Sequence, residues 1–137
     1  MKTLDMRFIR YLNLFERHTG VSTKNCFEYN SNVIFVVPGQ LVSRAIGENG
    51  NNMKGLREVM GKNIKVIAEP MGIQDVEKFV KDIIEPLGFK SIDARGEEIV
   101  INAGTQYKAS LIGRNKTRLM ELKEIIKSYF GKELRIM

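Results

Sequence analysis

The chain has 137 residues, 43% of them hydrophobic and 28% charged, which fits one ordinary domain or two very small ones. It contains no run of 18 apolar residues, and Cys26 is its one cysteine, so we expect no membrane span, no internal disulfide and a cytoplasmic location. The net charge of +6 and the pI of about 9.5 are typical of proteins that bind nucleic acid or an acidic partner.

The first half of the chain alternates helical and strand patterns. Phe8, Leu12 and Phe15 recur at helical spacing, with Thr3 as the expected N-cap and Gly20 as the end. The predicted elements are a helix over residues 3–20, strands over 25–30 and 32–39, a helix over 41–46, a turn over 47–50, a helix that Gly61 closes, and a strand over 63–70. The five apolar residues from Val33 to Val37 predict a strand that is buried on both faces. In the last strand, Ile64, Val66 and Ala68 are expected to point inward.

The second half shows the same kinds of pattern in the same order. The predicted elements are a helix over residues 75–89, two strands over 90–96 and 97–104, a helix over 105–112, a turn over 113–116, a helix over 117–131 and a strand over 132–137. Gly96 is expected to form the turn between the strands, and Thr105 to cap the helix that follows.

The matching order indicates an internal repeat. At an offset of 66, the first half aligns with the second through the pairs Ile46/Ile112, Gly47/Gly113, Asn49/Asn115, Leu56/Leu122, Glu58/Glu124 and Val59/Ile125. The later helix is then one turn longer, after which "GKNIKV" aligns with "GKELRI" at an offset of 70. We therefore predict two domains of one fold, over residues 1–69 and 73–137, joined by a short linker over 70–72.

The two turns between helices are the candidate sites. Two helices that meet at a four-residue turn leave backbone N–H groups exposed at the start of the second helix. That end carries partial positive charge and suits a phosphate group. Glycine in the turn removes the Cβ that would keep a sugar-phosphate backbone at a distance.

The stretch "IGENG" between two helices, in the order α-β-β-α-α-β, resembles a KH domain of the type II arrangement, whose GXXG loop clamps about four nucleotides of RNA. Two such domains in tandem resemble the archaeal NusA-like transcription factors. The resemblance implies an α+β fold in which a three-stranded mixed sheet in each domain is covered by helices on one face. It further implies binding of single-stranded RNA in transcription termination or antitermination, with RNA polymerase or a nascent-transcript complex as a further partner.

The residues in and beside the two turns are the expected RNA-binding residues. They are Arg44, Gly47, Glu48, Asn49, Gly50, Asn51, Lys54, Arg57, Lys108, Gly113, Arg114, Asn115, Lys116 and Arg118. Glu48 stands where type II loops often carry a basic residue, and Lys116 replaces the second glycine. We therefore hypothesise that the first turn binds through its backbone and the second through the charges of Arg114 and Lys116.

Basic charge gathers around the second turn. Residues 104–137 hold eight Lys or Arg against three Asp or Glu, a net charge of +5. Residues 73–98 hold four against seven, a net charge of −3, and we interpret that acidic segment as an ordinary solvated surface. Lys127 and Lys132 are weaker candidates for phosphate contacts than the cations beside the turns.

An enzymatic function is not expected. His18 is the one histidine and lies at a helix end, where capping is the simplest role, and Cys26 lies in a predicted strand as a small core residue. No catalytic triad, metal site, cofactor motif or small-molecule substrate is predicted. Two alternatives remain open: a ribosome- or polymerase-associated KH scaffold that binds RNA weakly, and a helix-turn-helix protein that binds duplex DNA.

Overall fold

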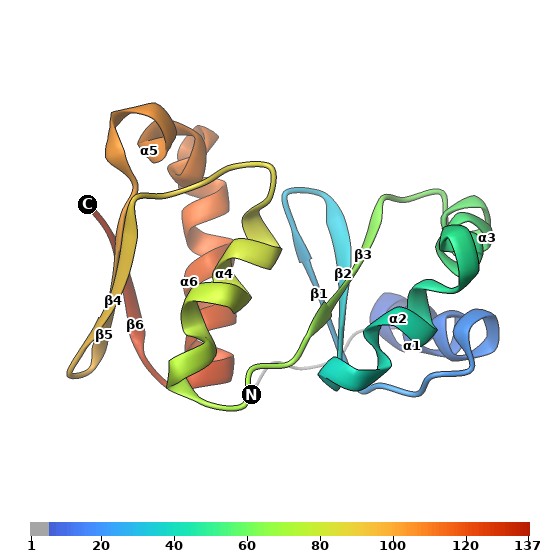
Figure 1. The fold of residues 1–137 in the computed structure, drawn as a ribbon. Helices are drawn as coiled ribbons and strands as arrows, with labels where there is room; N and C mark the ends of the chain where they lie inside the picture. The colour runs from blue at the N-terminus through green and yellow to red at the C-terminus, as the bar shows by residue number, and fades with distance from the viewer. Residues whose placement is uncertain (1–5) are drawn as a thin grey trace. The chain divides into compact units, whose positions relative to one another are not determined.

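The computed structural model describes residues 6–137, which form an α+β fold of six α-helices and two three-stranded mixed sheets (Figure 1). The chain divides into two compact units between Glu69 and Pro70. The elements are α1 (Met6–Thr19), β1 (Asn25–Tyr29), β2 (Asn32–Val37), α2 (Val42–Ile46), α3 (Asn51–Met60), β3 (Ile64–Ala68), α4 (Val76–Ile84), β4 (Ser91–Arg95), β5 (Glu98–Asn102), α5 (Gly104–Ile112), α6 (Thr117–Phe130) and β6 (Glu133–Ile136). No helix within residues 6–137 is long and apolar enough to cross a membrane.

Both units pair their strands in the same way. The first sheet has the order β1-β2-β3, with β1 antiparallel and β3 parallel to β2. The second has the order β4-β5-β6, again with one antiparallel and one parallel pair. A parallel pair needs a crossover connection. In each unit the crossover is a pair of helices, α2 with α3 or α5 with α6, and the candidate turn joins the two.

The core of the first unit lies between its helices and one face of its sheet, as Figure 1 shows. The rings of Phe15 on α1 and Phe35 on β2 are fully buried and stack with their centroids 4.3 Å apart. Leu56 on α3 and Ala45 on α2 belong to the same cluster, so all three helices are held against the sheet. Burying each large apolar side chain contributes about 1.5–3 kcal/mol. The prediction that Val33–Val37 is buried throughout is confirmed.

The second unit anchors α4 on α6 through aromatic side chains. Phe79 of α4 is 2% exposed, and its ring centroid lies 4.8 Å from that of Tyr129 and 5.8 Å from that of Phe130. Val80 and Ile83 on the same helix are also buried, as the helical spacing predicts. This packing fixes α6, whose first turn begins at the candidate site.

Glycines in the left-handed conformation end the helices that were expected to stop there. Gly20 follows α1 with φ of 72°, Gly61 follows α3 with φ of 66°, and Gly131 follows α6 with φ of 65°. The Gly61 N–H donates to the Arg57 carbonyl at 2.7 Å, as a C-terminal cap should. Helix α6 has 14 residues against 10 in α3, so the predicted extra turn is confirmed.

Three details differ from the sequence-based expectation. Helix α5 begins at Gly104, with Ala103 as its N-cap, so Thr105 lies inside the helix. Helix α4 ends at Ile84 and not at residue 89, because Pro86 cannot continue a helix. On β3, Ile67 is buried as well as Ile64. Because β3 pairs in parallel with β2, which is buried on both faces, buried and exposed residues need not alternate along it. The expected N-cap Thr3 lies outside the described residues.

Candidate nucleic-acid interface

The two turns between the paired helices have the same backbone conformation. Gly47 and Gly113 each precede three residues that lead into the next helix. The φ and ψ values are 82° and 169° at Gly47, and 76° and 171° at Gly113. They are 56° and 24° at Asn49, and 56° and 26° at Asn115. At the third pair they are 73° and 17° at Gly50, and 61° and 23° at Lys116. The aligned pairs of the sequence repeat are therefore structural equivalents at these positions.

Two successive left-handed residues shape each turn. Asn is among the residues that tolerate this conformation, which accounts for Asn49 and Asn115 at the same place. Lysine tolerates it poorly, at a cost of about 1–2 kcal/mol, yet Lys116 adopts it with φ of 61°. The Asn-Gly pair of the first turn takes the conformations of a tight hairpin turn, but helices and not strands lie on both sides.

Part of the turn backbone is engaged internally. The Gly50 N–H donates to the Gly47 carbonyl at 3.1 Å, and the Asn51 N–H donates to the Glu48 carbonyl. In the second turn the Lys116 N–H donates to the Gly113 carbonyl at 3.2 Å. The next amides, in the first turns of α3 and α6, have no acceptor within their own helix and form the positive end of its dipole. These amides are the donors suited to a phosphate oxygen.

One side chain spans each turn and binds the helix on its other side. Asn52 Nδ2 donates to the Arg44 carbonyl at 3.2 Å, and Arg118 Nη1 donates to the Ser110 carbonyl at 2.9 Å. Asn52 and Arg118 are equivalent positions at the repeat offset of 66, and so are the two acceptors. Arg118 is among the residues expected to bind RNA, whereas Asn52 is not. The sequence feature that points to Asn52 is its alignment with Arg118, which also carries a hydrogen-bond donor.

The glycines of the first turn are required for different reasons. A Cβ at Gly47 would lie 2.8 Å from Asn52 Cγ, which is closer than real Cβ contacts come. A Cβ at Gly113 would likewise lie 3.0 Å from Arg118 Cγ. A Cβ at Gly50 would meet no described heavy atom within 4 Å. Gly47 is therefore required by packing inside the turn, whereas the space in front of Gly50 is open to a ligand.

The exposed cations divide unequally between the turns. Arg44 and Lys54 are exposed beside the first turn, together with the carboxylate of Glu48. Three exposed cations flank the second turn, namely Lys108, Arg114 and Lys116. Thr117 Oγ1 donates to the Arg114 carbonyl at 2.7 Å and steadies this stretch of backbone. The second turn thus has more exposed positive charge than the first, which is the difference from which two modes of phosphate binding were predicted.

Several other predicted cations use their side chains within the fold. Arg57 Nη2 donates to the Ile64 carbonyl at 3.2 Å and ties α3 to the start of β3. Lys127 forms an ion pair with Glu133 at 3.0 Å, and Lys132 donates to the Gly96 carbonyl. These partners tie the side chains of Arg57, Lys127 and Lys132 to other parts of the fold.

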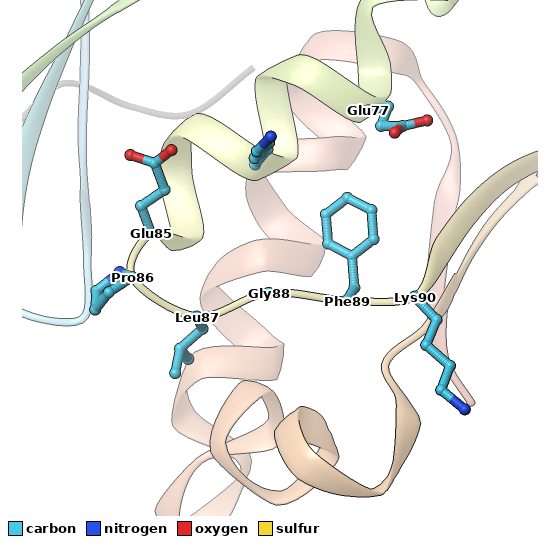
Figure 2. Close-up of a pocket in the computed structure, with 8 residues that line it drawn as sticks. Glu77, Glu85, Pro86, Leu87, Gly88, Phe89 and Lys90 are labelled. Carbon is cyan, nitrogen blue, oxygen red and sulfur yellow. The ribbon is translucent and has the colours of Figure 1, made fainter.

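A hollow of about 630 Å³ lies elsewhere in the second unit, between α4 and the loop that follows it. Figure 2 shows the Phe89 ring in the space between loop and helix, with Glu77 and Glu85 toward the two ends of α4. Lys81 and Lys90 also line the hollow, so its two carboxylates are balanced by two ammonium groups and it offers phosphate no net positive charge. On the same helix Lys78 bonds Asp82 at 2.8 Å, and this hydrogen bond raises the pKa of the Lys78 ammonium. Such pairing fits the interpretation of the acidic segment as a solvated surface.

Comparison with known proteins gives partial likenesses. No family model matches the chain. The probable transcription termination protein NusA of Methanococcus vannielii is 29% identical over 79 residues, which is 58% of this chain and 44% of that protein, so the match spans less than half of the relative. The crystal structure of APE1850 aligns with 98% of this chain and all of its own, with a TM-score of 0.65 and 29% identity. The strand order and pairing are consistent with a KH-like fold.

Proposed function

We propose that this chain binds single-stranded RNA and acts with the transcription machinery in termination or antitermination. The observation that carries the proposal is the shared conformation of the two turns, each at the start of a helix that completes the same crossover. A conformation kept in two units despite Lys116 at a disfavoured φ argues for a function of the turn itself. The NusA likeness supports the link to transcription.

In this proposal the units are two tandem type II KH domains, over residues 1–69 and 73–137, with 70–72 between them. Each turn would hold about four nucleotides beside it, in the manner of a GXXG loop. Nascent RNA is the expected ligand, and RNA polymerase is the expected protein partner. The proposed activity is binding and assigns no catalytic residue or cofactor.

The two turns would hold phosphate by different means. In the first, the open space at Gly50 lets a phosphate approach the amides at the start of α3. In the second, the exposed side chains of Arg114 and Lys116 supply charge where Lys116 takes the place of glycine. Phosphate contacts of both kinds position the RNA and carry no sequence information.

A scaffold on RNA polymerase that binds RNA weakly is the second candidate. Glu48 favours it, because an exposed carboxylate at the tip of the first turn repels the phosphate that the neighbouring amides attract. Under this alternative the first unit would contact protein, and RNA affinity would come from the second turn alone.

The test is fluorescence anisotropy with labelled single-stranded RNA, duplex RNA and duplex DNA over a salt series. We expect single-stranded RNA to bind most tightly, with a logarithmic salt slope of about −0.7 for each phosphate neutralised. Tighter binding to duplex DNA would indicate the helix-turn-helix alternative. Absence of binding to all three nucleic acids would favour the scaffold and contradict the proposal.

Gly50 supplies a matched pair of variants for the same assay. Gly50→Asn keeps a residue that tolerates the left-handed conformation, whereas Gly50→Asp adds a carboxylate of nearly the same size. We expect Gly50→Asp to bind RNA about tenfold more weakly than Gly50→Asn, because only the charge differs. Equal affinities would show that no phosphate approaches the first turn.

A further inference from the structure

We propose that Asn52 and Arg118 are positioning residues, each of which holds its turn in the conformation that receives RNA. The inference rests on the proposed function and assigns a role to two side chains that bridge the helices on either side of a turn. For Arg118 it replaces the direct phosphate contact that the sequence suggests with an internal role.

The first line of evidence is the pair of equivalent hydrogen bonds. Asn52 reaches the Arg44 carbonyl at 3.2 Å and Arg118 reaches the Ser110 carbonyl at 2.9 Å, each across the turn to a residue eight positions earlier. The acceptors lie in the last turns of α2 and α5, where carbonyls have no partner within the helix. Two chemically different side chains thus make equivalent hydrogen bonds across backbone turns of the same conformation.

The second line of evidence is packing against the first glycine of each turn. The space where a Cβ of Gly47 would lie is occupied by Cγ and Nδ2 of Asn52, both 2.8 Å away. At Gly113 it is occupied by Cγ and Cβ of Arg118, at 3.0 and 3.2 Å. The bridging side chain therefore packs directly on the glycine. It holds in place a φ and ψ combination, near 80° and 170°, that is essentially confined to glycine.

The consequence concerns binding, because a loop that is already ordered loses less entropy when a ligand arrives. Helix α2 has only five residues, so it depends on its neighbours to stay aligned with α3. With the bridge removed, the turn would sample other conformations, and the amides at the start of the helix would no longer converge on one phosphate.

The decisive variants exploit the fact that equivalent positions of the two turns hold Asn52 and Arg118. Arg118→Ala and Asn52→Ala remove the bridge, whereas Arg118→Asn installs at the second turn the residue that makes the bridge in the first. As a control for Arg118→Ala, Lys123→Ala removes an exposed positive charge from α6. As a control for Asn52→Ala, Asn63→Ala removes an exposed side-chain amide. Each protein is measured for RNA affinity by anisotropy over a salt series. Amide hydrogen exchange at Gly50 and Lys116 is measured without RNA.

We expect both alanine variants to bind single-stranded RNA about three- to tenfold more weakly, as the loss of one hydrogen bond predicts, and to exchange the Gly50 or Lys116 amide faster. Arg118→Asn should keep the protection and most of the affinity. If Arg118→Asn binds as weakly as Arg118→Ala and its salt slope falls by about 0.7, Arg118 contacts phosphate directly and the inference is wrong. Unchanged exchange in both alanine variants also overturns it. If the wild-type chain binds no RNA, the proposed function fails, while the exchange rates still decide whether these residues hold the turns.

Discussion

At the scale of single residues, one turn conformation accommodates different residues at two of three paired positions. Asn49 and Asn115 are identical, Gly50 and Lys116 differ in flexibility and charge, and Asn52 and Arg118 differ in charge but share an acceptor position. The two turns share their backbone geometry, which aligns the two helices and orients the N-terminus of the second helix. In the proposed function, the side chains would then set how much of the attraction for phosphate comes from amides and how much from cations.

The two glycines of the first turn should respond differently to alanine. Gly47→Ala is expected to lower the free energy of unfolding by about 3 kcal/mol, because its φ and ψ are close to glycine-only and its Cβ would collide with Asn52. Gly50→Ala should cost about 1 kcal/mol, since only the left-handed conformation opposes it. Urea denaturation of each variant measures both values.

The Asn52 side chain supplies the control for this comparison. In an Asn52→Ala background the cost of Gly47→Ala should fall by about 1 kcal/mol, because the colliding atoms are gone, whereas the cost of Gly50→Ala should stay the same. Strict additivity of Gly47→Ala and Asn52→Ala would contradict the packing described for the turn.

At the scale of secondary-structure elements, the position of each candidate turn follows from the parallel strand pair. The chain must return from the end of β2 to the start of β3, and from β5 to β6, and a pair of helices makes each crossing. Arg57 secures the first crossing by linking α3 to the Ile64 carbonyl. The second crossing depends on the longer α6, which packs against α4 through Phe79.

Phe79 is expected to be the main anchor of α4. Phe79→Ala should lower the free energy of unfolding of the second unit by about 3–5 kcal/mol, because it empties a fully buried aromatic site between α4 and α6. The measurement is urea denaturation followed by NMR resonances of residues in the second unit. Phe89→Ala is the control, since Phe89 is half-buried beside the hollow, and its cost should be about 1 kcal/mol. Similar losses at Phe79 and Phe89 would rule out the anchoring role.

At the scale of the whole molecule, the net charge of +6 is distributed unevenly. The segment from residue 104 to 137 has a net charge of +5, while residues 73–98 have −3. Within the second unit, attraction of an RNA strand would therefore be directed toward the second turn, where Lys108, Arg114 and Lys116 are exposed. In the first unit the contribution of charge is reduced by Glu48.

Removal of the two cations in the second turn should test this division. Arg114→Ala with Lys116→Ala is expected to weaken RNA binding about tenfold or more and to reduce the magnitude of the salt slope by about 1.4, as two lost phosphate contacts predict. A control with Lys24→Ala and Lys123→Ala lowers the net charge equally at exposed positions away from the turns. Anisotropy at several salt concentrations measures both. A control that matches the turn variant would mean that overall charge alone sets the affinity.

The sequence by itself determined the order of elements and most of their limits, because apolar periodicity and glycine positions are local signals. The repeat offset, the extra turn of α6 and the full burial of Val33–Val37 were all predictable in this way. Local signals were misleading at the start of α5, where Ala103 and not Thr105 precedes the helix.

Only the tertiary structure decided how the side chains around the turns are used. Charge and spacing predict Arg57 and Arg118 as phosphate ligands, and the fold adds that both guanidinium groups donate to carbonyls within it. The role of Asn52 depends on a carbonyl eight residues away that comes near only when two helices fold back on each other, so its alignment with Arg118 is the one sequence signal that points to it. The sequence shows which groups a turn contains, and the folded backbone determines which of them remain available to a ligand.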